Sequence, residues 1–198
     1  MDKCMDRDKD LNQENCDSDR VLLSEIAEVD SNDFTASLAI ISNISRTNFL
    51  FQRKDSTYPI EEMRGRLCLF GGAPNEGESP LLALQRELHE ELNTSVISEL
   101  INSIVQWRYF SALPTVSQPG TYSLVVSIAS IEDTLFERFA DEMTSGHVIL
   151  EGEGVCLTYE GLKVRLAKPD SWAFSQDKVV AAFIENLNKV TPSEEDAS

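Results

Sequence analysis

Apolar and polar positions alternate along this chain in short blocks that predict strands interleaved with a few helices. Residues 34–42 are rich in β-branched and aliphatic side chains, end at Asn43, and are followed by a second apolar run over residues 48–53. Two such runs separated by a short polar turn predict a β-hairpin. A polar loop over residues 54–65 then leads to another expected strand over residues 66–70.

The clearest helical pattern follows this strand and a glycine-rich loop. Ser79 is suited to cap the helix, Pro80 is suited to its first turn, and strong helix formers continue to Leu92. Four leucines recur on one side of the predicted helix, namely Leu81, Leu84, Leu88 and Leu92. At about 100° per residue, we expect that side to face a core.

The rest of the chain continues the mixture of strands and helices. Residues 96–110 are apolar over too long a stretch for one strand, so we expect a break or bend near Ser103. Further strands are expected over residues 121–129, 148–150 and 155–158, a loop over residues 111–120, and helices over residues 132–143 and after a cap at Ser175. Without regular βαβ alternation, this order indicates an α+β fold or a three-layer arrangement.

Acidic side chains add chemistry to the leucine-bearing helix. Glu87, Glu90 and Glu91 fall together on another of its sides. Carboxylates at these spacings repel one another by about a few tenths of a kcal/mol per pair on an exposed helix, and by more where water is excluded. A cation would reverse that sign, and Mg²⁺ prefers such oxygen ligands. A solvated acidic face would explain neither the glycine loop nor the spacing of Glu78 and Arg86.

Gly72, Glu78 and the block Arg-Glu-Leu-His-Glu-Glu that runs from Arg86 to Glu91 resemble the Nudix box, the signature of the Nudix hydrolase family. Six such fixed positions recur by chance on the order of once in 10^4 sequences of this length. One position departs, because Asn93 stands where the family has Gly. Asn also tolerates the left-handed conformation at a helix C terminus, so we expect the helix cap to be kept.

The resemblance implies a Nudix-type α/β/α sandwich around a mixed β-sheet, formed by residues 34–189. It also implies a Mg²⁺-dependent pyrophosphohydrolase, in which water attacks a phosphorus of a nucleoside diphosphate linked to another moiety. The substrate would be a nucleotide, a nucleotide sugar or a dinucleoside polyphosphate. The alternative is a regulatory module that binds a nucleotide on the same fold without turning it over, although such a sensor has no need to keep every metal ligand.

The resemblance assigns roles to the residues of the box. Glu87, Glu90 and Glu91, with the carbonyl of Gly71, would hold Mg²⁺ or Mn²⁺. Glu87 is also the first candidate for activating water. Arg86 and Glu78 would orient these carboxylates through hydrogen bonds, as the residues behind metal ligands commonly do.

Three residues outside the box are candidates for substrate binding. Arg53, like the neighbouring Lys54, could meet a phosphate, although the two also fit a solvated pair at a strand end, which is the favoured interpretation. Tyr109 could stack on a nucleobase, although aromatic residues at strand spacing are ordinary packing. Glu151 lies in a glycine-flanked loop and could add a carboxylate to the metal site, or could belong to an exposed turn. His89, by contrast, is expected to be a surface or satisfied side chain.

Composition limits the remaining possibilities. The chain has 198 residues and a formal net charge of -17, which argues against binding a nucleic-acid duplex through a basic face. Part of this acidity lies in an N-terminal extension over residues 1–33, expected to be partly disordered, and in a C-terminal tail over residues 190–198. We expect a small-molecule phosphoanhydride as the partner, and the oligomeric state, including a homodimer, stays open.

The cysteines and the hydropathy of the chain indicate its compartment. Cys68 and Cys156 lie in apolar runs typical of buried free thiols, and the four cysteines show no paired metal spacing. The first residues lack the apolar region of a secretory signal, and no apolar run approaches the length of a membrane span. We therefore expect a cytoplasmic protein that does not enter a membrane.

Overall fold

The computed structural model of the chain describes residues 34–112, 122–144 and 148–190. Its elements are, in order, β1 (Ala36–Asn43), β2 (Asn48–Arg53), η1 (Glu61–Met63), β3 (Leu67–Cys68), β4 (Phe70–Gly72), α2 (Pro80–Glu91), α3 (Ile97–Asn102), β5 (Ile104–Ala112), β6 (Tyr122–Ile131), α4 (Asp133–Thr144), β7 (Glu153–Thr158), α5 (Tyr159–Leu166), η2 (Pro169–Ser171) and α6 (Gln176–Val190). The acidic extension over residues 1–33, most of the loop over residues 111–120 and nearly all of the C-terminal tail lie outside the described residues.

Seven strands form one mixed sheet with β1 near its centre. The main strand order is β3-β2-β1-β6-β5, with β4 also paired to β1 and β7 also paired to β2. The β1–β6 pair is parallel, whereas the other strand pairs are antiparallel. Close to the turn that joins them, β1 and β2 pair with each other. Farther from the turn, the same edge of β1 pairs with β4, and the same edge of β2 pairs with β3. The two strands therefore diverge, and the segment containing β3 and β4 fills the space between them.

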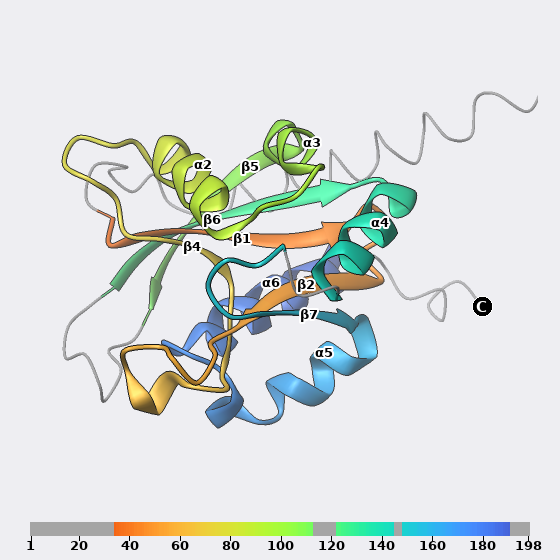
Figure 1. Cartoon of the computed structure of the whole chain (residues 1–198). Helices are drawn as coiled ribbons and strands as arrows, with labels where there is room; N and C mark the ends of the chain where they lie inside the picture. Colours follow the sequence, from red (N-terminus) through yellow and green to blue (C-terminus); the bar gives the residue numbers. More distant parts are fainter. Residues whose placement is uncertain (1–33, 113–121, 145–147, 191–198) are drawn as a thin grey trace, which may run out of the picture.

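Helices cover both faces of the sheet (Figure 1). On one face, α2, α3 and α4 contribute a core that includes Leu84, Leu88, Leu100 and Phe139. On the other face, α5 and α6 pack their own apolar residues on the sheet, around the buried Trp172. The α+β fold class, with an α/β/α sandwich around a mixed sheet, is confirmed.

The elements with strong local signals match their predictions. The hairpin of β1 and β2, the strand β6 and the helices α4 and α6 lie within a few residues of the expected ranges. Helix α2 begins as predicted after Ser79, whose Oγ accepts a hydrogen bond from the backbone N–H of Leu82 at 3.4 Å. Short-range capping and periodicity were therefore sufficient to locate these elements.

Two strand predictions are wrong. The first half of the apolar stretch 96–110 is helix α3, because Val96, Leu100 and Ile104 recur at helical spacing and pack on the core of the same face. The predicted break near Ser103 is where this helix ends and β5 begins. Residues 148–150 make an isolated bridge, Ile149 to Leu92, in place of a strand. Helix α5 was not predicted.

Two details of side-chain placement also differ from expectation. Leu81 is 38% exposed, although the first turn of α2 is tied to β1 by a hydrogen bond from Ser37 Oγ to the carbonyl of Pro80 at 2.8 Å. Cys68 is buried as expected, but Cys156 is exposed. Its strand β7 is paired with β2 alone among the described strands and so forms an edge of the sheet.

The end of α2 is not the left-handed cap that was expected. Leu92 follows the helix in an extended conformation, with φ -121° and ψ 122°. Asn93 lacks a positive φ, and its N–H donates to the carbonyl of Val148 at 2.8 Å. The chain thus leaves the helix by pairing with the 148–150 segment, a contact that removes the need for glycine at this position.

Across the described ranges, no helix combines the length and the apolar character that crossing a membrane requires.

Two leucines of α2 test the packing of this helix. Leu88 is fully buried, whereas Leu82 is 57% exposed. We expect Leu88→Ala to lower the free energy of unfolding by about 2–5 kcal/mol, because it leaves a cavity in the core. Leu82→Ala on the same helix should change it by less than about 0.5 kcal/mol. Urea denaturation of both variants measures the difference, and equal losses would contradict the packing described.

Candidate functional site

Strand β4, which precedes α2, lies close enough to β1 and to that helix to require glycine at two positions. Gly71 has a φ of 115°, and a Cβ there would lie 2.1 Å from the carbonyl oxygen of Ser37. A Cβ on Gly72 would lie 2.6 Å from the carboxyl carbon of Glu87. The backbone of β4 therefore lies directly against a carboxylate of α2.

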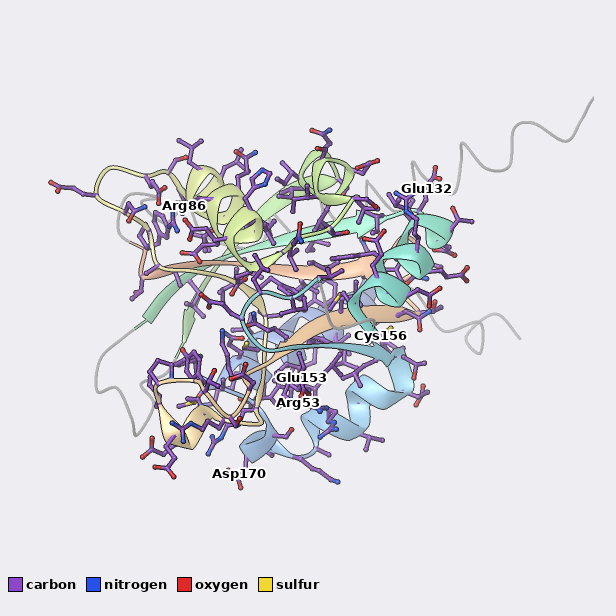
Figure 2. The ribbon with its side chains drawn as sticks, in the orientation of Figure 1. Arg53, Arg86, Glu132, Glu153, Cys156 and Asp170 are labelled. Carbon is purple, nitrogen blue, oxygen red and sulfur yellow. The ribbon has the colours of Figure 1, made fainter. Side chains whose placement is uncertain are left out.

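Arg86 lies on α2 (Figure 2) and joins the helix to the preceding loop by hydrogen bonds. Its Nε and Nη2 atoms donate to the two carboxylate oxygens of Glu78 at 2.9 and 3.0 Å. Its Nη1 donates to Glu87 at 2.8 Å and to Glu90 at 2.9 Å, and Nη2 also donates to the carbonyl of Ala73 at 2.9 Å. One guanidinium thus holds three carboxylates and the backbone of the loop, in the forked geometry that suits Arg.

The charge of Glu78 is strongly favoured in this arrangement. Hydrogen bonds from Arg86 and from the backbone N–H of Asn75 lower the pKa of Glu78 to about 2. The carboxylates of Glu78 and Glu87 raise the pKa of Arg86, and the hydrogen bond to Glu78 is the largest cause. The pair stays fully ionised across the physiological range and fixes the loop to α2.

Glu91 has the opposite environment. Its side chain is buried, one carboxylate oxygen accepts from the N–H of Gly71 at 2.8 Å, and the other lies 3.5 Å from Nε2 of Gln52 and 4.0 Å from Nζ of Lys54. Burial raises the pKa of Glu91 to about 7, against the lowering effects of the Gly71 N–H and of Lys54. Glu87 raises this pKa further through its negative charge.

A buried polar network continues from Glu91 into the sheet. The Cys68 thiol lies 3.2 Å from Oε1 of Gln52, and burial raises the pKa of this thiol to about 12. The Lys54 ammonium lies 4.9 Å from the ring centroid of Tyr58. These side chains surround Glu91 with polar groups on its interior side.

A cavity of about 310 Å³ opens beside this network. It is bounded by the backbone from Gly71 to Ala73 and by Lys54 and Tyr58. The remaining wall includes side chains from β1, β6 and the start of α6, and is largely apolar: Ala36, Leu38, Leu69, Leu124, Phe174 and Gln176. The volume is at the lower end of the range of small-molecule pockets.

The structure divides the predicted metal ligands between two sides of α2. Glu87 and Glu90 both accept from Arg86, whereas Glu91 turns inward toward Gly71. Within the described residues, no three His, Cys, Asp or Glu side chains come together as a metal cage. The donor set nevertheless fits a hard divalent ion in its chemistry, because it consists of carboxylates on adjacent helical positions beside a close strand backbone.

The candidate residues outside the box have different surroundings. Arg53 forms an ion pair with Glu153 at 3.3 Å on the paired strands β2 and β7 (Figure 2). Glu151 is exposed, yet its charge contributes to raising the pKa of Glu91. Tyr109 pairs with Val125 in the sheet, but its side chain lies outside the described part of the structure. His89 is exposed on α2, as expected.

Lys54 is the site residue whose environment was misjudged from the sequence. It was expected to be solvated with Arg53, but it is 7% exposed. The signal was its spacing, because Leu50, Gln52 and Lys54 share one face at strand period two. Leu50 belongs to the core under α2, so Lys54 on the same side continues toward Glu91.

Comparison with known proteins shows which family and which solved structures this chain resembles. The sequence matches the NUDIX domain over residues 34–148, more than half of the chain. No curated protein sequence matches the chain.

Two solved structures show a similar fold. The bifunctional NMN adenylyltransferase/ADP ribose pyrophosphatase from Francisella tularensis, complexed with AMP and a Mn ion, has a TM-score of 0.50 and 13% identity over 91% of this chain. The alignment spans 47% of that protein, so this chain corresponds to about half of it. The MutT protein from Methanosarcina mazei Go1 has a TM-score of 0.50 and 15% identity, over 81% of this chain and 99% of that one.

These structural likenesses concern the fold alone, since their identities are low. The NUDIX match is independent of them, and it spans β1 to the bridge after α4, including the loop and helix that carry Glu78, Arg86 and Glu91. The chain belongs to the NUDIX domain family.

Proposed function

We propose that this protein is a divalent-metal-dependent hydrolase that cleaves a phosphoanhydride bond in a nucleotide substrate. The observation that carries the proposal is the carboxylate-rich face of α2, held by Arg86 on one side and by the backbone of Gly71 on the other, with Gly71 and Gly72 also lining a cavity. A bare cluster of carboxylates is costly, whereas carboxylates held ready for a cation are useful to phosphoryl transfer.

Glu87, Glu90 and Glu91, together with the carbonyl of Gly71, would hold Mg²⁺ or Mn²⁺. Such an ion supplies charge stabilisation at phosphoryl oxygens and a template for the attacking water. The structurally similar Francisella tularensis protein, of which this chain covers about half, was solved with AMP and a Mn ion.

The chain's own residues would supply positioning. Arg86 is a positioning residue, because it fixes Glu87 and Glu90 while its bidentate bond to Glu78 ties the helix to the loop. Glu87 lies against the backbone at Gly72 and is our candidate for accepting a proton from water. Preorganised groups of this kind contribute most of the catalysis where the protein forms no covalent bond to the substrate.

Glu91 would contribute a carboxylate whose ionisation depends on its surroundings. Burial holds its pKa near neutrality, and a cation at its side would favour the ionised form. The residue is therefore suited to bind an ion tightly in the interior but unsuited to remain charged alone.

Replacing Glu91 tests the proposed function. We expect Glu91→Gln to lower Mg²⁺-dependent hydrolysis by about 100-fold or more, since even residues behind metal ligands are worth about 10–100-fold. The assay measures phosphate and nucleotide products from nucleoside triphosphates, nucleotide sugars, ADP-ribose and dinucleoside polyphosphates. The control is Glu137→Gln, which removes an exposed carboxylate on α4 and should keep full activity. A fully active Glu91→Gln enzyme would contradict the assignment, and binding without cleavage by the unaltered protein would favour a non-catalytic nucleotide-binding module.

The same substitution should have the reverse effect on stability in metal-free buffer. Because the pKa of Glu91 is raised to about 7 in the folded state, the native protein holds a proton that the unfolded chain releases above its ordinary pKa. Stability is therefore lost as the pH rises from about 4.5 toward 7. We expect Glu91→Gln to be more stable than the unaltered protein by up to about 3 kcal/mol at pH 8, with the difference vanishing below pH ~4.5.

Chemical denaturation with EDTA at several pH values measures this difference. Glu137→Gln again serves as the control and should follow the unaltered protein at each pH. A stability gain in Glu91→Gln that does not change between pH 5 and pH 8 would show that burial of a charge at this position is not its cause.

A further inference from the structure

The cavity beside Glu91 has a wall with few polar groups, and this makes each of them informative. Its apolar part includes Leu38, Leu124 and Phe174, together with the ring of Tyr58. Among the described residues that line it, Lys54 is the one with a charged side chain. A wall of this kind suits a flat, largely apolar group and is poorly suited to a hydroxyl-rich sugar, whose polar groups would find few partners.

Lys54 brings a buried ammonium to this wall without a hydrogen bond. The residue is 7% exposed, its nearest carboxylate oxygen, on Glu91, is 4.0 Å away, and its other described contact is the face of Tyr58 at 4.9 Å. An ammonium has three N–H donors, and the described residues supply no hydrogen-bond acceptor for any of them, so they are left to water or to a ligand in the cavity. The position therefore calls for an anionic or strongly accepting group of a ligand, close to Glu91.

Gln176 presents a second donor, in an orientation that the backbone fixes. It is 5% exposed, and its Oε1 accepts from the N–H of Leu69 at 2.6 Å. Because a backbone N–H can only donate, the oxygen of the amide must face it and the NH₂ group must face elsewhere. Within the described chain, Nε2 of Gln176 has no hydrogen-bond partner, while the residue lines the cavity.

We propose that the cavity binds the nucleobase of a nucleoside phosphate, that Lys54 binds a phosphate oxygen of the same molecule, and that Gln176 selects the base by donating to an acceptor on its edge. This inference rests on the proposed function and names the part of the substrate that is not hydrolysed. The phosphate is placed at Lys54 because this ammonium is the charged group among the described residues of the wall and lies 4.0 Å from Glu91. The base is placed among the apolar residues near Gln176.

The chemistry of Gln176 sets a direction for the selection. Its fixed NH₂ group can donate a hydrogen bond to a carbonyl or a ring nitrogen of the base. An amino group of the base at the same place would have no hydrogen-bond partner there. A site that donates a buried hydrogen bond discriminates more strongly than apolar contact does, because the unmatched polar group loses its solvation. Gln176 is therefore expected to affect recognition of the base and not the chemistry at α2.

Binding of reaction-product analogues tests the proposal without requiring turnover. The probes are AMP, GMP, CMP and UMP, with ribose 5-phosphate as the probe that keeps the phosphate and lacks the base. Isothermal titration calorimetry in Mg²⁺ buffer should show at least one nucleoside monophosphate binding about tenfold or more tightly than ribose 5-phosphate. Equal affinity for ribose 5-phosphate and for all four monophosphates, or no binding of any probe at millimolar concentration, would overturn the inference.

Gln176→Glu separates recognition from a structural role. The new carboxylate can still accept from the Leu69 N–H while the free donor becomes an acceptor, and a thermal melt shows whether the variant is folded. We expect the preferred monophosphate to bind about 10–100-fold more weakly to this variant, with ribose 5-phosphate changed by less than about threefold. Asn102→Asp, the same amide-to-acid change at an exposed position of α3, is the control and should bind like the unaltered protein. Unchanged binding by Gln176→Glu would overturn the role of this residue.

Lys54→Met tests the phosphate contact, since it keeps most of the aliphatic stem and removes the charge. Both the monophosphate and ribose 5-phosphate should bind about tenfold more weakly, whereas Lys163→Met, at an exposed ion pair on α5, should have no effect. A thermal melt of each variant shows whether it is folded, and Lys54→Arg, which restores the charge, should recover part of the affinity. If Mg²⁺-dependent hydrolysis depends on Glu91 but base selectivity is absent, the inference fails and the proposed function stands.

Discussion

Repulsion between carboxylates on α2 and in the loop before it is the constraint on which this structure depends. Four acidic side chains lie within a short distance of one another, and the protein offsets their charges in two ways. Arg86 neutralises Glu78, Glu87 and Glu90 by direct hydrogen bonds near the surface. Glu91 is instead buried, where the N–H of Gly71 binds it, Gln52 and Lys54 lie farther away, and burial raises its pKa. The helix therefore carries a charged outer side and an inner carboxylate that is easily protonated.

The topology of the sheet brings the backbone of Gly71 within hydrogen-bond distance of Glu91. Because β1 and β2 diverge, the segment between Leu67 and Gly72 lies between them and brings its backbone beneath α2. The N–H of Gly71 can then bind Glu91, while the next residue has room for no side chain beside Glu87. The glycines of the loop are thus explained by contacts with strand and helix, in addition to the freedom of a turn.

Local signals predicted much of the fold, and tertiary contacts decided the rest. The β1–β2 hairpin and α2 depend on strand propensity, a serine cap and leucine spacing, all of which can be found in neighbouring residues. Helix α3 was mistaken for a strand because its apolar residues suit either element until the core they join is known. Cys156 was expected to be buried, since the sequence does not reveal that β7 forms an edge of the sheet.

The residues of the Nudix box could be identified from their spacing in the sequence. The different environments of the carboxylates in the box were not predicted. At about 100° per residue, Glu91 lies only about 20° from Leu84 around the helix, so its burial beside the leucines could have been predicted. Lys54 carried a similar signal in its strand spacing. The free amide of Gln176 could not have been predicted, because it depends on a hydrogen bond to Leu69, which is far away in the sequence.

The cavity wall has one further property, which concerns how such a protein can change over evolutionary time. Phe174 and Gln176 lie beyond residue 148, where the match to the NUDIX domain ends. The acidic helix and the far wall of the cavity thus come from separate stretches of the chain. Substitutions near the start of α6 can therefore reshape this wall without replacing any residue of the acidic helix, so the two parts can change independently of each other.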